Sequence, residues 1–105
     1  MTMKNKVFSN LGLAMRAGKL VTGDESVLEA VRSGEAKLVV VAEDASDNTR
    51  KKIADKCSFY EVPLFVYGSR NELGGSIGKP ERVVMAVTDA GFAKLIGDRL
   101  HPSAE

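Results

Sequence analysis

A glycine followed by three polar residues, Gly-Asp-Glu-Ser at positions 23–26, stands directly before apolar residues spaced as on one face of a helix. The pattern places these residues at a helix N-terminus, where free backbone N–H groups attract a phosphate or the edge of a base. The two acids repel phosphate, but a carboxylate accepts hydrogen bonds from the amino group of guanine or cytosine. Arg16 and Lys19, just upstream, offset the repulsion. Spacing alone leaves two interpretations open, a contact with RNA and a simple helix cap.

The two side-chain types most useful for nucleophilic and acid–base catalysis occur once each, as Cys57 and His101. An enzyme needs several titratable groups that converge on one place. Cys57 falls on an apolar helical face, and His101 stands beside Pro102 in a fraying chain end. A single cysteine also excludes an intramolecular disulfide and a thiolate metal cage built from this chain alone. The sequence therefore predicts no catalytic residue, no metal site and no cofactor.

Two further motifs invite a phosphate-related function. The run Gly-Gly-Ser-Ile-Gly-Lys at 74–79 resembles a phosphate-binding loop, but three residues instead of four separate Gly74 from Gly78, and Pro80 replaces the required Ser or Thr. The pair Glu43-Asp44 resembles half of a phospho-acceptor pocket, but the chain has no second acidic cluster near its start. We interpret the small residues as allowing a helix to lie close to the sheet, and the acidic pair as solvated carboxylates.

The elements that must position these residues alternate between helix and strand. Apolar residues at helical spacing predict helices over 4–17 and 24–33, and three more that begin after the capping residues Ser46, Ser69 and Asp89. Gly18, Gly34 and Gly78 are expected to end helices. Apolar, β-branched runs predict strands at 20–22, 38–42, 63–67 and 82–87. The side chains expected to face inward from the third and the last helix are Ile53, Cys57, Tyr60, Phe92, Leu95 and Ile96.

This alternation, with short connections, predicts an α/β fold in which helices cover both faces of a small mixed sheet. The length of 105 residues and the apolar share of 44% fit one domain, spanning 1–105, with one core. No stretch of 18 consecutive apolar residues occurs, and polar residues interrupt the N-terminal segment. We therefore expect a cytoplasmic protein that does not enter a membrane.

The charge is small in total but uneven along the chain. The formal net charge is +1, which by itself gives little support for a polyanionic partner. Residues 1–23 contain Lys4, Lys6, Arg16 and Lys19 and no acid, whereas residues 24–47 are rich in carboxylates. A nucleic-acid contact is therefore expected to start from the basic segment.

Five motifs follow one another over nearly the full length: LGLAxRAGKLVxG at 11–23, AKLVVVAEDAS at 36–46, ELG at 72–74, IGK at 77–79 and AVTDxGFA at 86–93. In this order they resemble the kink-turn RNA-binding ribosomal proteins related to L7Ae and L30e, and specifically their small bacterial branch. The resemblance implies a three-layer α/β/α sandwich around a small four-stranded mixed sheet. It also implies a non-catalytic role in binding structured RNA, such as ribosomal RNA, in translation.

In that family the RNA is held by the loop and helix that follow the glycine matched by Gly23, and by the loop before the last strand. Here that second loop is 79–82, leading into Val83. We expect the basic residues to share one face of the fold, with residues 23–26 between them. The RNA-binding residues implied are Arg16, Lys19, Gly23, Asp24, Glu25, Ser26, Lys37, Lys79, Arg82 and Val83.

The chain departs from the family pattern at the start of the second helix. Kink-turn binders follow the glycine with an Asn-Glu pair and place a Lys one turn later, whereas Glu25, Ser26 and Glu29 occupy those positions here. The departure and the near-neutral charge leave a second hypothesis open, a protein-interaction adaptor that keeps the fold but has lost the RNA site. Fold alone does not choose between the two.

Overall fold

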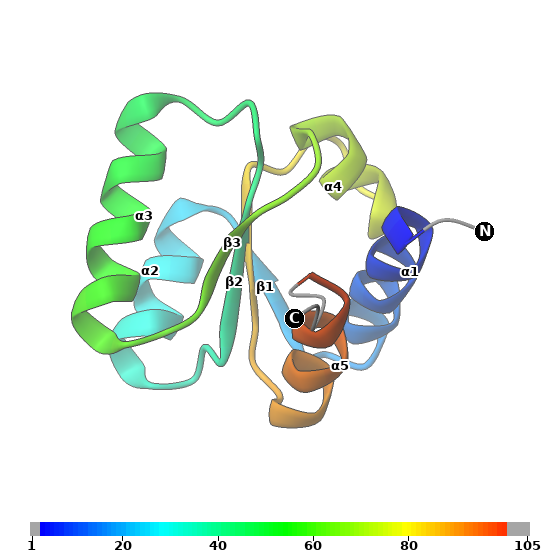
Figure 1. The fold of residues 1–105 in the computed structure, drawn as a ribbon, viewed down its shortest axis with the longest axis horizontal. Helices are drawn as coiled ribbons and strands as arrows, with labels where there is room; N and C mark the ends of the chain where they lie inside the picture. Colours follow the sequence, from blue (N-terminus) through cyan, green and yellow to red (C-terminus); the bar gives the residue numbers. More distant parts are fainter. Residues whose placement is uncertain (1–2, 101–105) are drawn as a thin grey trace.

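The computed structural model describes residues 3–100, in which helices and strands alternate along the chain (Figure 1). The helices are α1 (Met3–Arg16), α2 (Asp24–Ser33), α3 (Asp47–Tyr60), α4 (Arg70–Ser76) and α5 (Ala90–Leu100). The strands are β1 (Leu20–Thr22), β2 (Leu38–Val41), β3 (Leu64–Val66) and β4 (Val84–Val87). The expected fraying end at His101 and Pro102 lies outside the described residues.

The four strands form one mixed sheet in the order β1-β4-β2-β3. β4 pairs antiparallel with both β1 and β2, and β2 pairs parallel with β3. β1, β2 and β3 therefore run in one direction, and helices α2, α3 and α4 all begin at the same edge of the sheet, the upper one in Figure 1. We call this edge the carboxyl end of the sheet and the opposite edge the amino end.

Helices cover both faces of the sheet, with α2 and α3 on one side and α1, α4 and α5 on the other (Figure 1). Alternation along the strands divides the buried side chains between two core clusters, because successive residues point to opposite faces. Val40 and Met85 belong to the cluster with α1 and α5, whereas Val39 and Val84 belong to the cluster with α2 and α3. The three-layer α/β/α sandwich with a four-stranded mixed sheet is confirmed.

The predicted helix caps are confirmed at three helices. The Ser46 hydroxyl accepts the Thr49 N–H at 3.1 Å, and Ser69 and Glu72 form a reciprocal capping box at 3.0 and 2.9 Å. The Asp89 carboxylate accepts the Phe92 N–H at 2.9 Å at the start of α5. These bonds satisfy backbone donors that a helix leaves without partners in its first turn.

Two of the predicted inward-facing residues are exposed. Tyr60 is the last residue of α3, and the chain turns at Glu61 with a φ of 59°, so the tyrosine is 38% exposed and packs edge-on against Phe59. Leu95 is 42% exposed because its neighbour Ile96 is the residue of α5 that enters the core.

The first strand is confirmed at 20–22, whereas the other three predicted strands are too long by one or two residues, and the last one starts late. β4 begins at Val84 instead of residue 82 because the Arg82 N–H donates to the Arg70 carbonyl at 3.0 Å, outside the sheet. Residues 82 and 83 therefore belong to the loop that precedes β4.

Candidate functional site

Gly23 joins β1 directly to α2 at the carboxyl end of the sheet. Its φ of 96° and ψ of 150° lie in a region that essentially only glycine occupies. Its N–H donates to the Val84 carbonyl at 3.1 Å, and its carbonyl accepts the Val27 N–H at 2.9 Å. The N-terminus of α2 is thereby held against the start of β4, which places Asp24, Glu25 and Ser26 beside the loop that precedes β4.

Arg82 attaches that loop to β1. Its Nε donates to the Thr22 hydroxyl at 3.2 Å, and its Nη1 donates to the carbonyls of Glu81 at 2.9 Å and Pro80 at 3.3 Å. Arg82, predicted as an RNA-binding residue, is therefore also a structural anchor, and its hydrogen-bond partners fix the position of its guanidinium. Val83 follows it, half-buried against the core on the α2 side, and its carbonyl accepts the Ala42 N–H at 2.8 Å.

Gly74 in α4 lies in close contact with the backbone of the same loop. A Cβ built on Gly74 would overlap the Pro80 carbonyl oxygen and lie 2.8 Å from the Cα of Glu81. The small residues of 74–78 were expected to bring the helix close to the sheet, but the backbone that Gly74 approaches is this loop. Gly78, with a φ of 72°, turns the chain toward Lys79 as expected.

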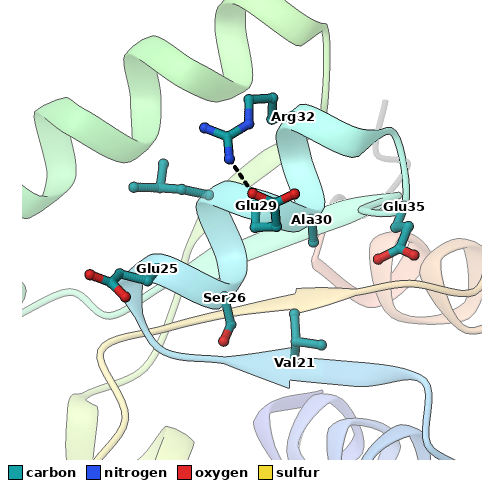
Figure 2. A pocket seen from close by; sticks show the side chains of 8 residues that line it. Val21, Glu25, Ser26, Glu29, Ala30, Arg32 and Glu35 are labelled. Carbon is teal, nitrogen blue, oxygen red and sulfur yellow. Dashed lines mark hydrogen bonds and ion pairs between the residues drawn. The ribbon is translucent and has the colours of Figure 1, made fainter.

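Carboxylates dominate the exposed side of α2. Figure 2 shows a hollow between α2 and β1 with Glu25 and Ser26 near the helix start, Glu29 paired with Arg32, and Val21 facing them from the strand. Asp24 lies outside this hollow, where its Oδ2 is 3.6 Å from Lys52 Nζ of α3. The start of α2 is therefore acidic, and one of its acids is neutralised by a cation from another helix.

Asp44 has a structural role that the sequence did not indicate. Its Oδ1 accepts the Arg70 N–H at 2.9 Å, its carbonyl accepts from the Arg70 guanidinium at 2.6 Å, and its Oδ2 lies 3.7 Å from Arg70 Nε. The interpretation of the acidic pair as merely solvated is wrong for Asp44, because this carboxylate positions the start of α4.

The basic residues of the predicted site do not share one face with residues 23–26 between them. Arg82 lies at the carboxyl end, whereas Lys19 and Lys37 lie at the amino end, next to Thr88 and Val87 at the close of β4. Arg16 ends α1 and belongs to the amino end as well, because the Lys19 N–H bonds back to the Ala14 carbonyl. The expectation was wrong because it used proximity in sequence, while β1 carries Lys19 and Gly23 to opposite edges of the sheet.

Cys57 lies where the sequence predicted a structural residue, whereas His101 lies outside the described residues. Cys57 is buried in the core between α3 and the sheet, and this burial raises the pKa of its thiol to about 11. The residues that the structure describes contain no cluster of three or more His, Cys, Asp or Glu side chains able to hold a metal ion. No helix within residues 3–100 is long and apolar enough to cross a membrane.

Sequence reasoning missed Thr22, Gly74 and Lys52 as parts of this site. Thr22 and Arg82 are 60 residues apart, and Lys52 reaches Asp24 from a different helix. No periodicity or local motif connects residues at such separations, so these contacts follow only from the tertiary fold.

A mixed sheet between two helical layers, with the N-terminus of α2 bonded beside the loop before β4, defines a class of small α/β domains. Within this class, the model of the Ribosomal protein L7Ae/L30e/S12e/Gadd45 family matches residues 5–96, and the chain belongs to that family. The predicted resemblance is confirmed.

Similar proteins agree with this assignment. An RNA-binding protein YlxQ of Bacillus subtilis is 57% identical over 85% of this chain and 90% of its own length. The large ribosomal subunit protein eL30 of Tetrahymena thermophila is 33% identical over 89% of this chain and 91% of its own. The solved structure of a protein of unknown function from Bacillus halodurans superposes with a TM-score of 0.88, at 47% identity, and covers 90% of this chain and 96% of that one.

Proposed function

We propose that this protein is a non-catalytic, cytoplasmic RNA-binding protein that recognises structured RNA of the kink-turn class in ribosomes or translation. Membership of the L7Ae family and the identity with an RNA-binding protein over 85% of the chain support this function. The structural observation that carries it is the prebuilt junction at the carboxyl end. There the Gly23–Val84 and Arg82–Thr22 hydrogen bonds hold the start of α2 and the 79–83 loop side by side.

The groups at this junction suit a folded RNA. Residues 24–26 offer backbone N–H groups at a helix N-terminus, a hydroxyl and carboxylates that accept from base amino groups. Lys79 and the guanidinium of Arg82 supply positive charge from the adjoining loop. Bases are thus read mainly by α2, while phosphates are positioned mainly by the loop.

Crosslinking in cells followed by sequencing of the bound RNA tests the proposal directly. Recovery of RNA segments that fold into kink-turns supports it. Recovery of proteins without RNA overturns it and favours the adaptor function.

In vitro, Lys79→Glu should weaken the binding of kink-turn duplexes of different sequence to the same degree, because a phosphate contact positions the protein without reading bases. The slope of log affinity against log salt should become shallower by about 1. Both are measured by titration at several salt concentrations. Lys94→Glu on α5, a cation whose side chain is 79% exposed, is the matched control and should leave binding unchanged. Equal effects of the two variants would remove the loop from the interface.

A protein-interaction adaptor is the second candidate, and one feature of α3 favours it. Phe59 is 78% exposed and packs against Tyr60 with ring centroids 4.9 Å apart. Exposed aromatic pairs are typical of protein contacts. Phe59→Ser should abolish partner capture if the adaptor function is correct, and should leave RNA crosslinking unchanged if the RNA function is correct.

A further inference from the structure

Two lysines border the same strand end at the amino end of the sheet. The Lys19 carbonyl accepts the Thr88 N–H at 2.9 Å, and the Lys37 N–H donates to the Val87 carbonyl at 2.7 Å. Because β4 lies between β1 and β2, their backbones are two strand spacings apart, roughly 10 Å.

Both lysines lie on the side of the sheet that carries α2. The next residues, Leu20 and Leu38, are buried in the cluster formed with α1 and α5, so the residue before each points toward the opposite face. The Lys37 Nζ confirms this direction, since it donates to the carbonyl of Gly34 at the end of α2 at 3.2 Å. A hollow at this place is lined by Gly18, Val21, Ser33, Gly34, Glu35, Lys37 and Thr88.

The charges at this end are left without acidic partners. Arg16, Lys19 and Lys37 are exposed and take part in no ion pair within the described residues. Elsewhere in the described part of the chain, the cations that form ion pairs with carboxylates are Arg32, Arg50, Lys51, Lys52, Arg70 and Lys94. Glu35 is the one acid that lines the hollow with Lys37, so positive charge prevails at this end.

An acidic strip separates this positive end from the carboxyl end. Along its exposed side α2 carries Glu25 at the carboxyl end and, one turn further, Glu29, which is paired with Arg32; Glu35 follows the helix at the amino end (Figure 2). A phosphate backbone that ran along α2 from one end to the other would be repelled by this strip. The cations of the amino end and those of the 79–83 loop therefore suit two separate backbone segments better than one continuous strand.

We propose that Arg16, Lys19 and Lys37 form a second RNA-backbone contact, which binds a segment of the folded RNA outside the kink-turn held at the carboxyl end. The inference rests on the proposed RNA function. It adds a sequence-independent contact made by cations to phosphates, at a place that neither α2's N-terminus nor the 79–83 loop reaches.

Two RNA probes separate the two contacts: a minimal kink-turn duplex, and the same duplex with both arms lengthened by one helical turn. The wild-type protein should bind the long duplex more tightly and with a steeper salt dependence. Lys19→Glu with Lys37→Glu should lower the affinity for the long duplex on the order of tenfold and make its salt slope shallower by about 2, while binding of the minimal duplex stays unchanged.

Two control variants keep this test sharp. Lys19→Arg with Lys37→Arg retains the charges and should bind the long duplex as the wild type does, and Lys94→Glu on α5, a helix that carries none of the three cations, should change neither duplex. Thermal unfolding confirms that each variant is folded. If the double Glu variant binds the long duplex as well as the wild type does, or loses equal affinity for both duplexes, the second contact is overturned while the proposed function stands. If the wild type binds neither duplex, the proposed function itself fails.

Discussion

Glu25 and Glu29 stand one turn apart on α2, but their charges are not equally available to a ligand. Glu29 forms an ion pair with Arg32, whereas Glu25 is exposed and has no ion pair among the described residues (Figure 2). The kink-turn-binding pattern that the sequence resembles has an Asn and a Lys at these two positions. Repulsion of an RNA backbone at the start of α2 should therefore come mainly from Glu25, with Glu29 partly compensated.

Glu25→Asn combined with Glu29→Lys should strengthen the binding of a kink-turn duplex. Removing one repulsion and turning the other into an attraction is worth about 1 to 2 kcal/mol if the phosphate lies within roughly 4 to 6 Å, which corresponds to about 5- to 30-fold in affinity. Titration of the duplex at fixed salt measures the change. Asp98→Lys on α5 is the matched control, because it too reverses one charge and breaks one ion pair on a helix surface. Equal gains in both variants would show a general effect of net charge instead of a contact at α2.

Cys57 makes the stability of the protein depend on pH in the alkaline range. Burial raises the pKa of its thiol from 9.0 to about 11, so between these values the unfolded chain loses a proton that the folded protein retains. The stability that the buried, protonated thiol contributes should be constant below pH 9, and the free energy of unfolding should fall as the pH rises from 9 toward 11. Chemical denaturation between pH 8 and 11 measures this loss, and Cys57→Ala should flatten the profile. A pH profile identical in both proteins would contradict a buried thiol.

At the scale of the elements, α4 and the loop before β4 can approach each other closely only because Gly74 has no side chain. Gly74→Ala places a methyl group on the Pro80 carbonyl, so either the loop or α4 must move. We expect a loss of about 1 to 3 kcal/mol in the free energy of unfolding. Because the same loop carries Lys79 and Arg82, RNA affinity should fall together with stability.

Gly75→Ala is the control for that substitution. Gly75 belongs to the same helix, and nothing lies within 4 Å of the Cβ it would gain. Alanine there should be neutral or stabilise by up to roughly 1 kcal/mol, since it lowers the entropy cost of the helix. Urea denaturation of the two variants compares them, and similar values for both would mean that α4 and the loop are not in close contact.

Most elements were predictable from local patterns, and the failures share a cause. Apolar periodicity and side-chain caps located every helix, because Ser46, Ser69 and Asp89 satisfy the first backbone donors of the helix that follows each. Tyr60 and Leu95 were assigned to the core on spacing alone. Tyr60 is exposed because the chain turns directly after it, and Leu95 is exposed because its neighbour Ile96 enters the core instead. The Arg82–Thr22 bond had no local signal at all.

At the scale of the whole molecule, the sheet converts a compact stretch of sequence into two distant surfaces. Residues 16–23 contain both the basic residues of the amino end and the glycine of the carboxyl end, with β1 between them. The prediction that the basic residues share one face relied on their proximity in sequence. In the structure the direction of the strands separates them between the two ends of the sheet. Charge distribution along a sequence therefore located the basic residues correctly but not the surfaces to which they belong.

The strand order has a consequence for the moment at which this protein becomes functional. β1 and β2, which are synthesised before β4, do not bond to each other, because β4 at residues 84–87 lies between them. A growing chain that has not yet released β4 has no complete sheet, and neither the Gly23–Val84 bond nor the Arg82–Thr22 bond can form in it. Such non-local pairing delays folding until most of the contacting residues are present. The junction proposed to hold RNA is thus assembled only after residues 84–87 have left the ribosome, so a growing chain that lacks them does not bind RNA through it.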